Sequence, residues 1–462
     1  MTLKQRRIYF LLFFLIFIIA VPILAFYSLG YRLDTDKFAL VKTGGIFINA
    51  DPRGVDIYVD GELKKKTSTM PFAQGKLVSG LLPGKHLIEV KKQNYSDWQK
   101  NLEVASNLVT EARNIFLPKA GAKPEMISEN AKDFIFSSSH ALIAYAVKNE
   151  IKLADVSSKE KAPASFKFSD GENIKKMSFS PNEKFILAET ELKNKSKFYI
   201  IGISSSEIKE ILKNSPEKYV KITWYPSDLD KLIALTNKNI LYSLNINVQN
   251  EQILLAKNTG NFAVFGDLII YSTTLPTVLY EKNTKSDATI QLTKTPIENF
   301  DLSSEIFRSK GGEIVILNNK KELLLYNYET QEFTSLANNI LYAIFSPDGK
   351  KLLFQNQNEI YIYYLRDIRI QPYKNAGETE LITRFSKPVK NSEWFEYNNE
   401  YIMLGAENNI KLIELDNRDK RNAYEIAEAK EPMKIKYNNY DDYIYFLDGS
   451  ELKKITLLEG NL

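Results

Sequence analysis

The chain opens on one long apolar run and then changes to short segments in which apolar and polar residues alternate. From Ile8 to Leu29 no residue is charged, and nearly all are Leu, Ile, Phe, Val, Ala or Tyr. An α-helix of these 22 residues would be about 33 Å long, which matches the roughly 30 Å hydrocarbon core of a bilayer. Pro22 lies inside the run, and a transmembrane helix can tolerate one proline. The run therefore predicts a membrane-spanning anchor.

A cleaved signal peptide is the alternative for this run. Its apolar region is usually about 7 to 15 residues and ends in a small-x-small cleavage site. This run is longer. No clear Ala-x-Ala occurs in AFYSLGYRLD, the segment that spans the end of the run and the residues after it. The basic residues before the run are Lys4, Arg6 and Arg7. By the positive-inside rule we expect a cytoplasmic tail at 1–7, a single-pass anchor at 8–29 and an extracytoplasmic chain after Tyr31.

After a predicted linker at 30–44, the residues of 45–118 alternate with a period of two, as in β-strands. In VDIYVDG, which begins at Val55, the apolar residues share one face and the segment ends in Asp-Gly, a tight-turn signal. A second turn signal, LLPG, precedes the alternating segment HLIEVKK. Several short β-strands joined by turns are therefore predicted for this region.

These segments resemble the PEGA domain, a small β-sandwich common in bacterial surface and envelope proteins. The features that carry the resemblance are IFINADPRG, the IYVDG hairpin, TSTMP, LLPGKHLIEV, and Tyr95 followed by Trp98. The namesake tetrapeptide reads PRGV here, from Pro52 to Val55, so its acidic residue is not retained. The resemblance implies a non-catalytic module that occurs beside other domains in envelope proteins. It transfers no ligand.

Beyond residue 118 the pattern repeats an aromatic residue, a polar turn and a short apolar strand. The clearest copies are MSFSPNEKFILAE and AIFSPDGKKLLFQ. With weaker copies, the aromatic anchors are Phe136, Phe179, Trp224, Phe265, Phe307, Phe345, Trp394 and Tyr437. They are 38 to 49 residues apart, close to the roughly 40 to 45 residues of a four-stranded propeller blade. Because stacked blades in a closed ring cover both faces of each sheet, 119–462 is predicted to be a β-propeller.

The phrase FSPDGKKLLF resembles the WD-repeat-like propeller of the TolB type, over about residues 132 to 458. Segments such as NEIKLADV and NEIYIYYL suit the third strand of a blade. The resemblance implies a fold rather than one function, since such propellers dock proteins, bind ligands or gate peptidases. Eight anchors favour eight blades. Seven is the alternative, because the last unit, 433–458, is short and a strand before Phe136 could complete it. Beyond the anchor, the chain is predicted to be all-β.

Composition removes several function classes. The chain has no cysteine, which excludes disulfides, thiolate nucleophiles, thiolate zinc sites and a lipid-bearing cysteine. Its formal charge is +4, with 61 basic and 57 acidic residues mixed along the sequence. No basic footprint for nucleic acid is present.

Candidate chemistry is sparse. A propeller-gated serine peptidase needs Gly-x-Ser-x-Gly and a downstream histidine on a hydrolase domain, and neither is found. His86 and His140 are the only histidines, and both are predicted to be structural. The aspartates of Asp348-Gly349 and Asp441-Asp442 are interpreted as turn residues, since no DxDxDG calcium loop occurs. No catalytic, metal or cofactor-binding residue is predicted, and ligand-binding residues are left unassigned.

We therefore expect a non-enzymatic, membrane-anchored scaffold whose extracytoplasmic propeller docks a protein, or a cell-wall or surface-layer polymer. One alternative is an envelope glycan-acting hydrolase with two carboxylates in the propeller funnel, assembled from distant blades. Another is a sensor, which would need a membrane partner because the predicted cytoplasmic tail is only residues 1–7. The partner, the binding face and the oligomeric state are not specified by the sequence.

Overall fold

A computed structural model describes most of the chain, and its described ranges are 3–35, 38–68, 70, 75–157, 163–213, 215–248 and 251–458. The chain divides into two compact units. Unit 1 holds Met1–Gly121, Asp367–Lys374 and Ile413–Tyr424, and unit 2 holds the remainder. Within the TSTMP segment, Thr69 and Pro71 lie outside the described residues. Unit 1 thus joins the N-terminal quarter of the chain to two short segments from far along the sequence.

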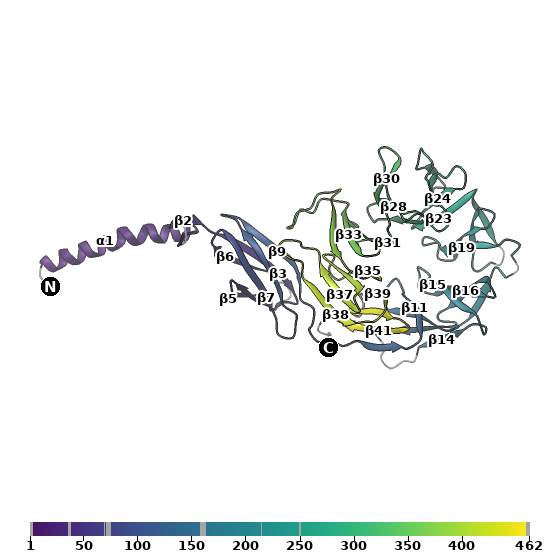
Figure 1. Ribbon diagram of the computed structural model, residues 1–462, viewed down its shortest axis with the longest axis horizontal. Coiled ribbons are helices and arrows are strands. Elements are labelled where there is room, and N and C mark those ends of the chain that lie inside the picture. Colours follow the sequence, from purple (N-terminus) through teal and green to yellow (C-terminus); the bar gives the residue numbers. More distant parts are fainter. Residues whose placement is uncertain are drawn as a thin grey trace. The chain divides into compact units, whose positions relative to one another are not determined.

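The N-terminal helix α1 (Leu3–Ser28) contains the whole predicted anchor except Leu29 and none of its residues is buried. It is long and apolar enough to serve as a membrane anchor or as a signal sequence. The helix ends where Gly30 takes a positive φ of 85°. A glycine in this left-handed conformation is a common helix stop, because it has no Cβ to clash with the preceding turn. The helix is the purple element of Figure 1.

A short hairpin follows the helix, where the sequence had predicted only a linker. Its strands are β1 (Tyr31–Asp34) and β2 (Ala39–Lys42), paired antiparallel. Its base is closed by Thr43, whose backbone N–H and Oγ1 both donate to the carbonyl of Gly30, at 2.9 and 2.8 Å.

Two sheets form the rest of the N-terminal part of unit 1. Their strands are β3 (Gly44–Asp51), β4 (Asp56–Val59), β5 (Glu62–Lys66), β6 (Lys76–Leu81), β7 (Gly84–Lys91), β8 (Trp98–Val104) and β9 (Val109–Phe116). One sheet has the order β6-β3-β9 and the other β5-β4-β7-β8. Strands β3 and β9 are parallel, and the other pairs are antiparallel.

The core of these two sheets follows the predicted alternation. Val55, Ile57 and Val59 are at most 1 % exposed. Side chains from both sheets join them in one apolar cluster, which includes Ile46 of β3 and Ile88 of β7. The predicted Asp-Gly turn joins β4 to β5, and both of its residues have positive φ, as a tight hairpin turn requires.

Eight four-stranded sheets, built from antiparallel strand pairs, lie between residues 125 and 456. The first four sheets are β11 (Ala131–Phe136), β12 (Leu142–Val147), β13 (Glu150–Asp155), β14 (Ala164–Lys167); β15 (Asn173–Phe179), β16 (Phe185–Leu192), β17 (Lys195–Gly202), β18 (Ile208–Ile211); β19 (Tyr219–Trp224), β20 (Lys231–Thr236), β21 (Ile240–Asn245), β22 (Gln252–Lys257); β23 (Thr259–Phe265), β24 (Leu268–Thr273), β25 (Leu279–Asn283), β26 (Thr289–Gln291). The other four are β27 (Glu305–Arg308), β28 (Ile314–Leu317), β29 (Leu323–Asn327), β30 (Glu332–Ala337); β31 (Tyr342–Phe345), β32 (Lys351–Gln355), β33 (Glu359–Tyr364), β34 (Thr379–Arg384); β35 (Asn391–Trp394), β36 (Tyr401–Ala406), β37 (Asn409–Glu414), β38 (Ala423–Glu428); β39 (Pro432–Asn438), β40 (Tyr443–Asp448), β41 (Glu451–Thr456), β10 (Glu125–Ser128).

The repeat found in the sequence corresponds to these sheets. Each of the eight aromatic anchors lies at the end of the first strand of a sheet, or one residue before it. The segments NEIKLADV and NEIYIYYL contain β13 and β33, which are third strands. Figure 1 shows β11, β15, β19, β23, β31, β35 and β39 near the middle of unit 2, with β14, β30, β33 and β41 further out.

Turn chemistry explains why the Ser-Pro copies are the clearest. The Ser180 hydroxyl donates to Asn182 Oδ1 at 2.7 Å and accepts from the N–H of Phe185 at 2.9 Å. In the other copy, the Ser346 hydroxyl donates to Asp348 Oδ1 at 2.6 Å and accepts from the N–H of Lys351 at 2.9 Å. The same serine and Asx side chains thus replace backbone partners in both turns.

The last sheet is completed by β10, a strand that comes before all the other strands of the eight sheets in the sequence. β10 pairs with β41, so the order is β10-β41-β40-β39, while β11 opens a separate sheet. Because β10 directly precedes β11 in the chain, its pairing with β41 holds the first and last sheets of the array together. The N–H of Ala131 in β11 also donates to the Ser450 carbonyl. The arrangement is consistent with a β-propeller.

Candidate functional site

The first polar centre lies in unit 1 and is built on β8. Alternate residues of this strand are buried, among them Trp98, Leu102 and Val104. The fourth member of this buried face is Lys100, whose side chain is completely inaccessible. A lysine therefore occupies a position that the period-two pattern gives to apolar residues. Burial of a charge requires a partner and full hydrogen bonding.

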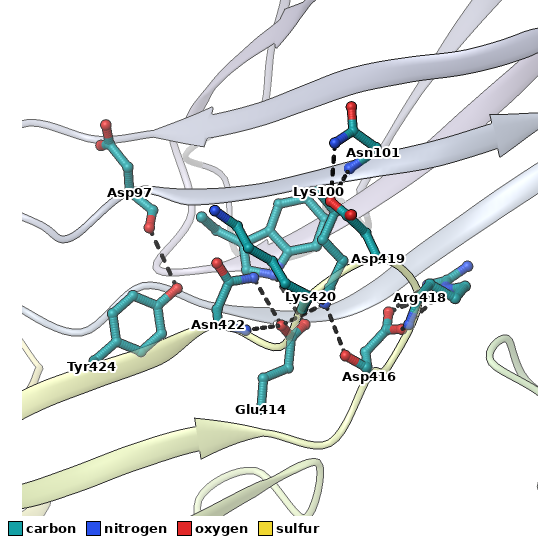
Figure 2. A network of polar contacts seen from close by, with 11 residues as sticks. Asp97, Lys100, Asn101, Glu414, Asp416, Arg418, Asp419, Lys420, Asn422 and Tyr424 are labelled. Carbon is teal, nitrogen blue, oxygen red and sulfur yellow. Dashed lines mark hydrogen bonds and ion pairs between the residues drawn. The ribbon is translucent and has the colours of Figure 1, made fainter. Parts of the chain in front are cut away.

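Lys100 meets both requirements (Figure 2). Its Nζ lies 3.2 Å from Glu414 Oε2 and donates to the carbonyls of Asp416 and Lys420 at 2.8 and 2.6 Å. An ammonium group has three protons, so each one has an acceptor. Glu414 is also buried, with 4 % of its side chain exposed.

Glu414 has further donors around its carboxylate. Trp98 Nε1 donates to its Oε1 at 2.9 Å, and Asn422 Nδ2 donates to its Oε2 at 2.8 Å. Burial raises the pKa of the Glu414 carboxyl, and the Lys100 charge and these two donors oppose that shift. The carboxylate thus has a hydrogen-bond donor on each oxygen and the Lys100 charge beside Oε2.

A more exposed set of contacts surrounds this pair. Asn101 donates from its backbone N–H and its Nδ2 to Asp419 Oδ2, at 2.9 and 3.0 Å. These hydrogen bonds, the backbone one first, lower the pKa of Asp419. Gln371 Oε1 accepts from the N–H of Glu111 at 3.0 Å and from Arg418 at 3.3 Å. We call the whole set, with Lys100 and Glu414 at its centre, the Lys100–Glu414 network. Its role is structural, because its donors and acceptors are occupied by one another.

The second polar centre lies in unit 2, on the first strands of the eight sheets. In five of them the register shifts by one residue near the start, as in a β-bulge. The residues just after the five bulges are Asp133, Lys176, Lys221, Asn261 and Lys434. All five are polar, and four of them are charged. A bulge re-aims the side chains beside it, so the repeated bulge places polar groups at one level of neighbouring sheets.

Two of these lysines make the same contacts with the next sheet. Lys221 Nζ donates to Asn261 Oδ1 at 2.8 Å and to the Phe262 carbonyl at 2.7 Å. Lys434 Nζ donates to Asp133 Oδ1 and to the Phe134 carbonyl, both at 2.7 Å. The Lys434 contact joins β39, the first strand of the last sheet, to β11, the first strand of the first sheet. It therefore helps to close the ring of sheets.

The electrostatics of this level reflect burial. Burial, followed by the nearby Lys176 charge, lowers the pKa of Lys221 to about 8, while Glu305 opposes both effects. On β35, Glu393 is buried, which raises its pKa, and it forms an ion pair with Lys436 of β39. These groups from separate first strands influence one another across the middle of unit 2. We call them the first-strand ring.

The two ends of the array differ in charge. The end with the hairpins between first and second strands is here called the turn end. Its eight hairpins contain three lysines and ten acidic residues, namely Glu183, Asp228, Asp230, Asp267, Glu313, Asp348, Glu396, Glu400, Asp441 and Asp442. At the opposite end, here called the start end, the hairpins between second and third strands contain five lysines and two glutamates. The turn end is therefore acidic relative to the start end.

Both ends also expose apolar side chains. At the turn end these include Leu229, Tyr397 and Tyr440, with 43, 38 and 53 % exposed. At the start end they include Val220, Leu341 and Met433, with 37, 49 and 57 % exposed. Two of the three at the turn end are tyrosines, and aromatic residues are enriched at protein interfaces.

The histidines singled out in the sequence occupy structural positions. His86 lies in β7, where its Nδ1 is 2.6 Å from Asp60 Oδ2 and its Nε2 is 2.8 Å from the Leu82 carbonyl. His140 lies in the turn after β11 and packs edge-on against Phe136. The two are in different units, and no common site brings them together.

Aspartates of the turns and the buried Glu172 also accept hydrogen bonds. Asp348 accepts from Ser346, and Asp441 Oδ2 accepts from the Tyr445 hydroxyl at 2.7 Å. The buried Glu172 Oε1 accepts from the Thr190 and Tyr199 hydroxyls. Among the residues that the structure describes, no group of three or more His, Asp or Glu side chains is placed to hold a metal ion.

Comparison with solved structures identifies the architecture of unit 2. The Dos1 propeller superposes with a TM-score of 0.51 at 12 % identity, over 73 % of this chain and 96 % of that chain. Unit 2 has a β-propeller fold. A eukaryotic initiation factor gives 0.49 at 14 % identity, over 74 % and 91 % of the two chains. The Cps50 (Swd1) β-propeller domain of Myceliophteria thermophila gives 0.43 at 11 % identity, over 72 % and 100 %.

Comparison by sequence gives no such match. No protein-family model matches the chain, and no curated protein matches it significantly. At identities this low, the structural likeness of this propeller establishes its fold and nothing about its partners.

Proposed function

We propose that this protein is a non-enzymatic scaffold, anchored in the cell membrane by α1, whose propeller docks another macromolecule outside the cytoplasm. The observation that carries the proposal is the turn end of the propeller, where exposed aromatic side chains stand among an excess of carboxylates. Interfaces use such aromatic anchors within a polar rim. Carboxylates around them favour a partner with basic groups and speed its encounter.

The same proposal extends to each part of the chain. The eight four-stranded sheets are eight blades, with β10 completing the last of them. The two-sheet part of unit 1 is a PEGA-like module, and the propeller is of the TolB type. Three basic residues before the helix support a cytoplasmic N-terminus, and the pairing of these two modules supports a place in a bacterial envelope. A protein or an envelope polymer is the docked partner.

The glycan-hydrolase alternative receives no support from the buried carboxylates. Retaining and inverting hydrolases need two carboxyl groups facing one substrate, about 5 to 10 Å apart. Glu172, Glu393 and Glu414 instead each accept from hydroxyl groups or face a lysine. These contacts give the three carboxylates a role in stabilising the fold.

The test is capture by the full-length protein in detergent, with envelope extracts and purified cell-wall polymers as the source of partners. The turn-end variant carries Leu229→Ser, Tyr397→Ser and Tyr440→Ser. The matched start-end variant carries serine at the three exposed apolar positions of the opposite end, Val220, Leu341 and Met433. Both variants remove partly exposed side chains. Because Tyr397 also packs on the buried rings of Phe395 and Tyr437, a thermal melt of each variant checks that the propeller stays folded.

We expect one protein or polymer to be captured by the wild type and the start-end variant, and to be lost at least tenfold with the turn-end variant. Capture should also weaken as salt rises, because the acidic rim is screened. Loss with the start-end variant alone would move the docking face to the other end. Turnover of a glycan without stable capture would refute the scaffold and support an enzyme.

A further inference from the structure

The hairpin β1–β2, directly after the helix, exposes apolar side chains that the fold does not use. Leu33 and Leu40 lie opposite each other in its register and are 60 and 57 % exposed. Phe38, next to β2, is 88 % exposed. It also has a positive φ of 49°, which is uncommon for a bulky residue. None of the three contributes to the apolar core of the two sheets.

The hairpin is joined to the end of the helix by specific contacts. Arg32 Nη1 donates to the carbonyls of Tyr27 and Tyr31 at 2.9 and 2.8 Å, and its guanidinium lies 3.5 Å from the centre of the Tyr27 ring. Phe26 packs edge-on against Tyr31, with ring centres 5.6 Å apart. With the Gly30–Thr43 hydrogen bonds at its base, the hairpin cannot move far from the helix terminus.

This combination matches a membrane–water interface. Tyrosine rings and arginine side chains are enriched at that level of transmembrane proteins, with apolar parts toward lipid and polar ends toward water. A four-residue strand is only about 13 Å long, so the exposed leucines and phenylalanine stay close to the level at which the helix ends. The hairpin is therefore continuous with the surface that the helix presents to lipid.

We propose that the β1–β2 hairpin is an interfacial membrane element, with Leu33, Phe38 and Leu40 inserted among the lipid headgroups and upper acyl chains. The inference rests on the proposed role of α1 as an uncleaved anchor. It adds a second contact with the lipid surface, which holds the chain that follows the helix near the bilayer.

The experiment uses the absence of native cysteine, so that one introduced cysteine carries one environment-sensitive NBD label. The full-length protein is reconstituted into phosphatidylcholine vesicles with 25 mol % phosphatidylglycerol, with or without lipids that carry a doxyl quencher. The quencher lies near the headgroup for the hairpin and sandwich labels, and deep in the acyl chain for the helix label. Thr35→Cys reports on the hairpin and leaves the three apolar residues intact. Leu15→Cys reports on the helix, and Glu62→Cys on an exposed strand of the sandwich.

We expect the label at Thr35→Cys to be quenched by doxyl lipid at least twofold more than the label at Glu62→Cys. Replacing Leu33, Phe38 and Leu40 by serine should reduce that quenching to the Glu62→Cys level. If the hairpin label behaves like the Glu62→Cys label while the Leu15→Cys label is quenched, the anchor holds and the interfacial hairpin is refuted. If the Leu15→Cys label is not quenched, the proposed anchor fails, and the hairpin proposal fails with it.

Discussion

Removing the charge of Lys100 should open part of unit 1 far more than removing an exposed lysine. In Lys100→Met, Glu414 stays buried without its cation, and the carbonyls of Asp416 and Lys420 lose their donor. Breaking a buried pair by removing one partner destabilises by about 3 to 5 kcal/mol. Lys85→Met is the matched control, since Lys85 is exposed on the neighbouring strand β7, and surface changes stay within about 0.5 kcal/mol.

Hydrogen exchange with mass spectrometry measures this effect locally. At about 1.4 kcal/mol per tenfold, the loss corresponds to roughly 10²- to 4 × 10³-fold faster exchange in peptides covering β8 and residues 413–424. Peptides from the first-strand ring should not change. Adding Glu414→Gln to Lys100→Met should cost less than the sum of the two single changes, by about 0.5 to 3 kcal/mol. If Lys100→Met exchanges like Lys85→Met, or if the two changes are additive, the pair does not hold these segments together.

Three further outcomes follow from the turns, the ring and the strand packing. Ser180→Ala and Ser346→Ala should each lower the free energy of unfolding of the propeller by about 1 kcal/mol in thermal melts, whereas Ser335→Ala, an exposed change, should not. The pKa of Lys221 falls from 10.5 to about 8 on folding. Between these pH values the unfolded chain binds more protons than the folded one, so the stability that this group contributes rises with pH. In urea melts Lys221→Met should lack this rise. Gly405→Ala would place a Cβ 2.6 to 2.9 Å from atoms of a neighbouring proline, its backbone oxygen included, and should destabilise by about 1 to 3 kcal/mol; an unchanged melting temperature would contradict the packing.

Local chemistry determined how much of the fold could be predicted. The aromatic anchors mark the first strands because each combines a strand end with a polar turn, and both signals lie within about ten residues. The alternation from Val55 to Val59 gave the correct buried face for the same reason. The hairpin at 31–42 was missed, since its two strands have only four residues each and show no extended alternation.

The polar centres could not be predicted from the sequence. Trp98 and Glu414 are 316 residues apart, and no local pattern connects positions at such a separation. The available signal was Lys100 itself, a lysine on the apolar face of an alternating strand, which requires a buried partner but does not say which. The bulges of the first-strand ring shift the register by one residue, which a period-two pattern does not reveal.

The composition of unit 1 from three separate stretches of chain has a consequence for biosynthesis. The strand that carries Trp98 and Lys100 emerges from the ribosome long before the stretch that carries Glu414. Until that later stretch has been made, a tryptophan and a lysine of the small sandwich have no partner for their polar ends. A protein cut after residue 121 would lack those partners permanently. The nascent N-terminal part therefore depends on the last quarter of the chain to finish folding.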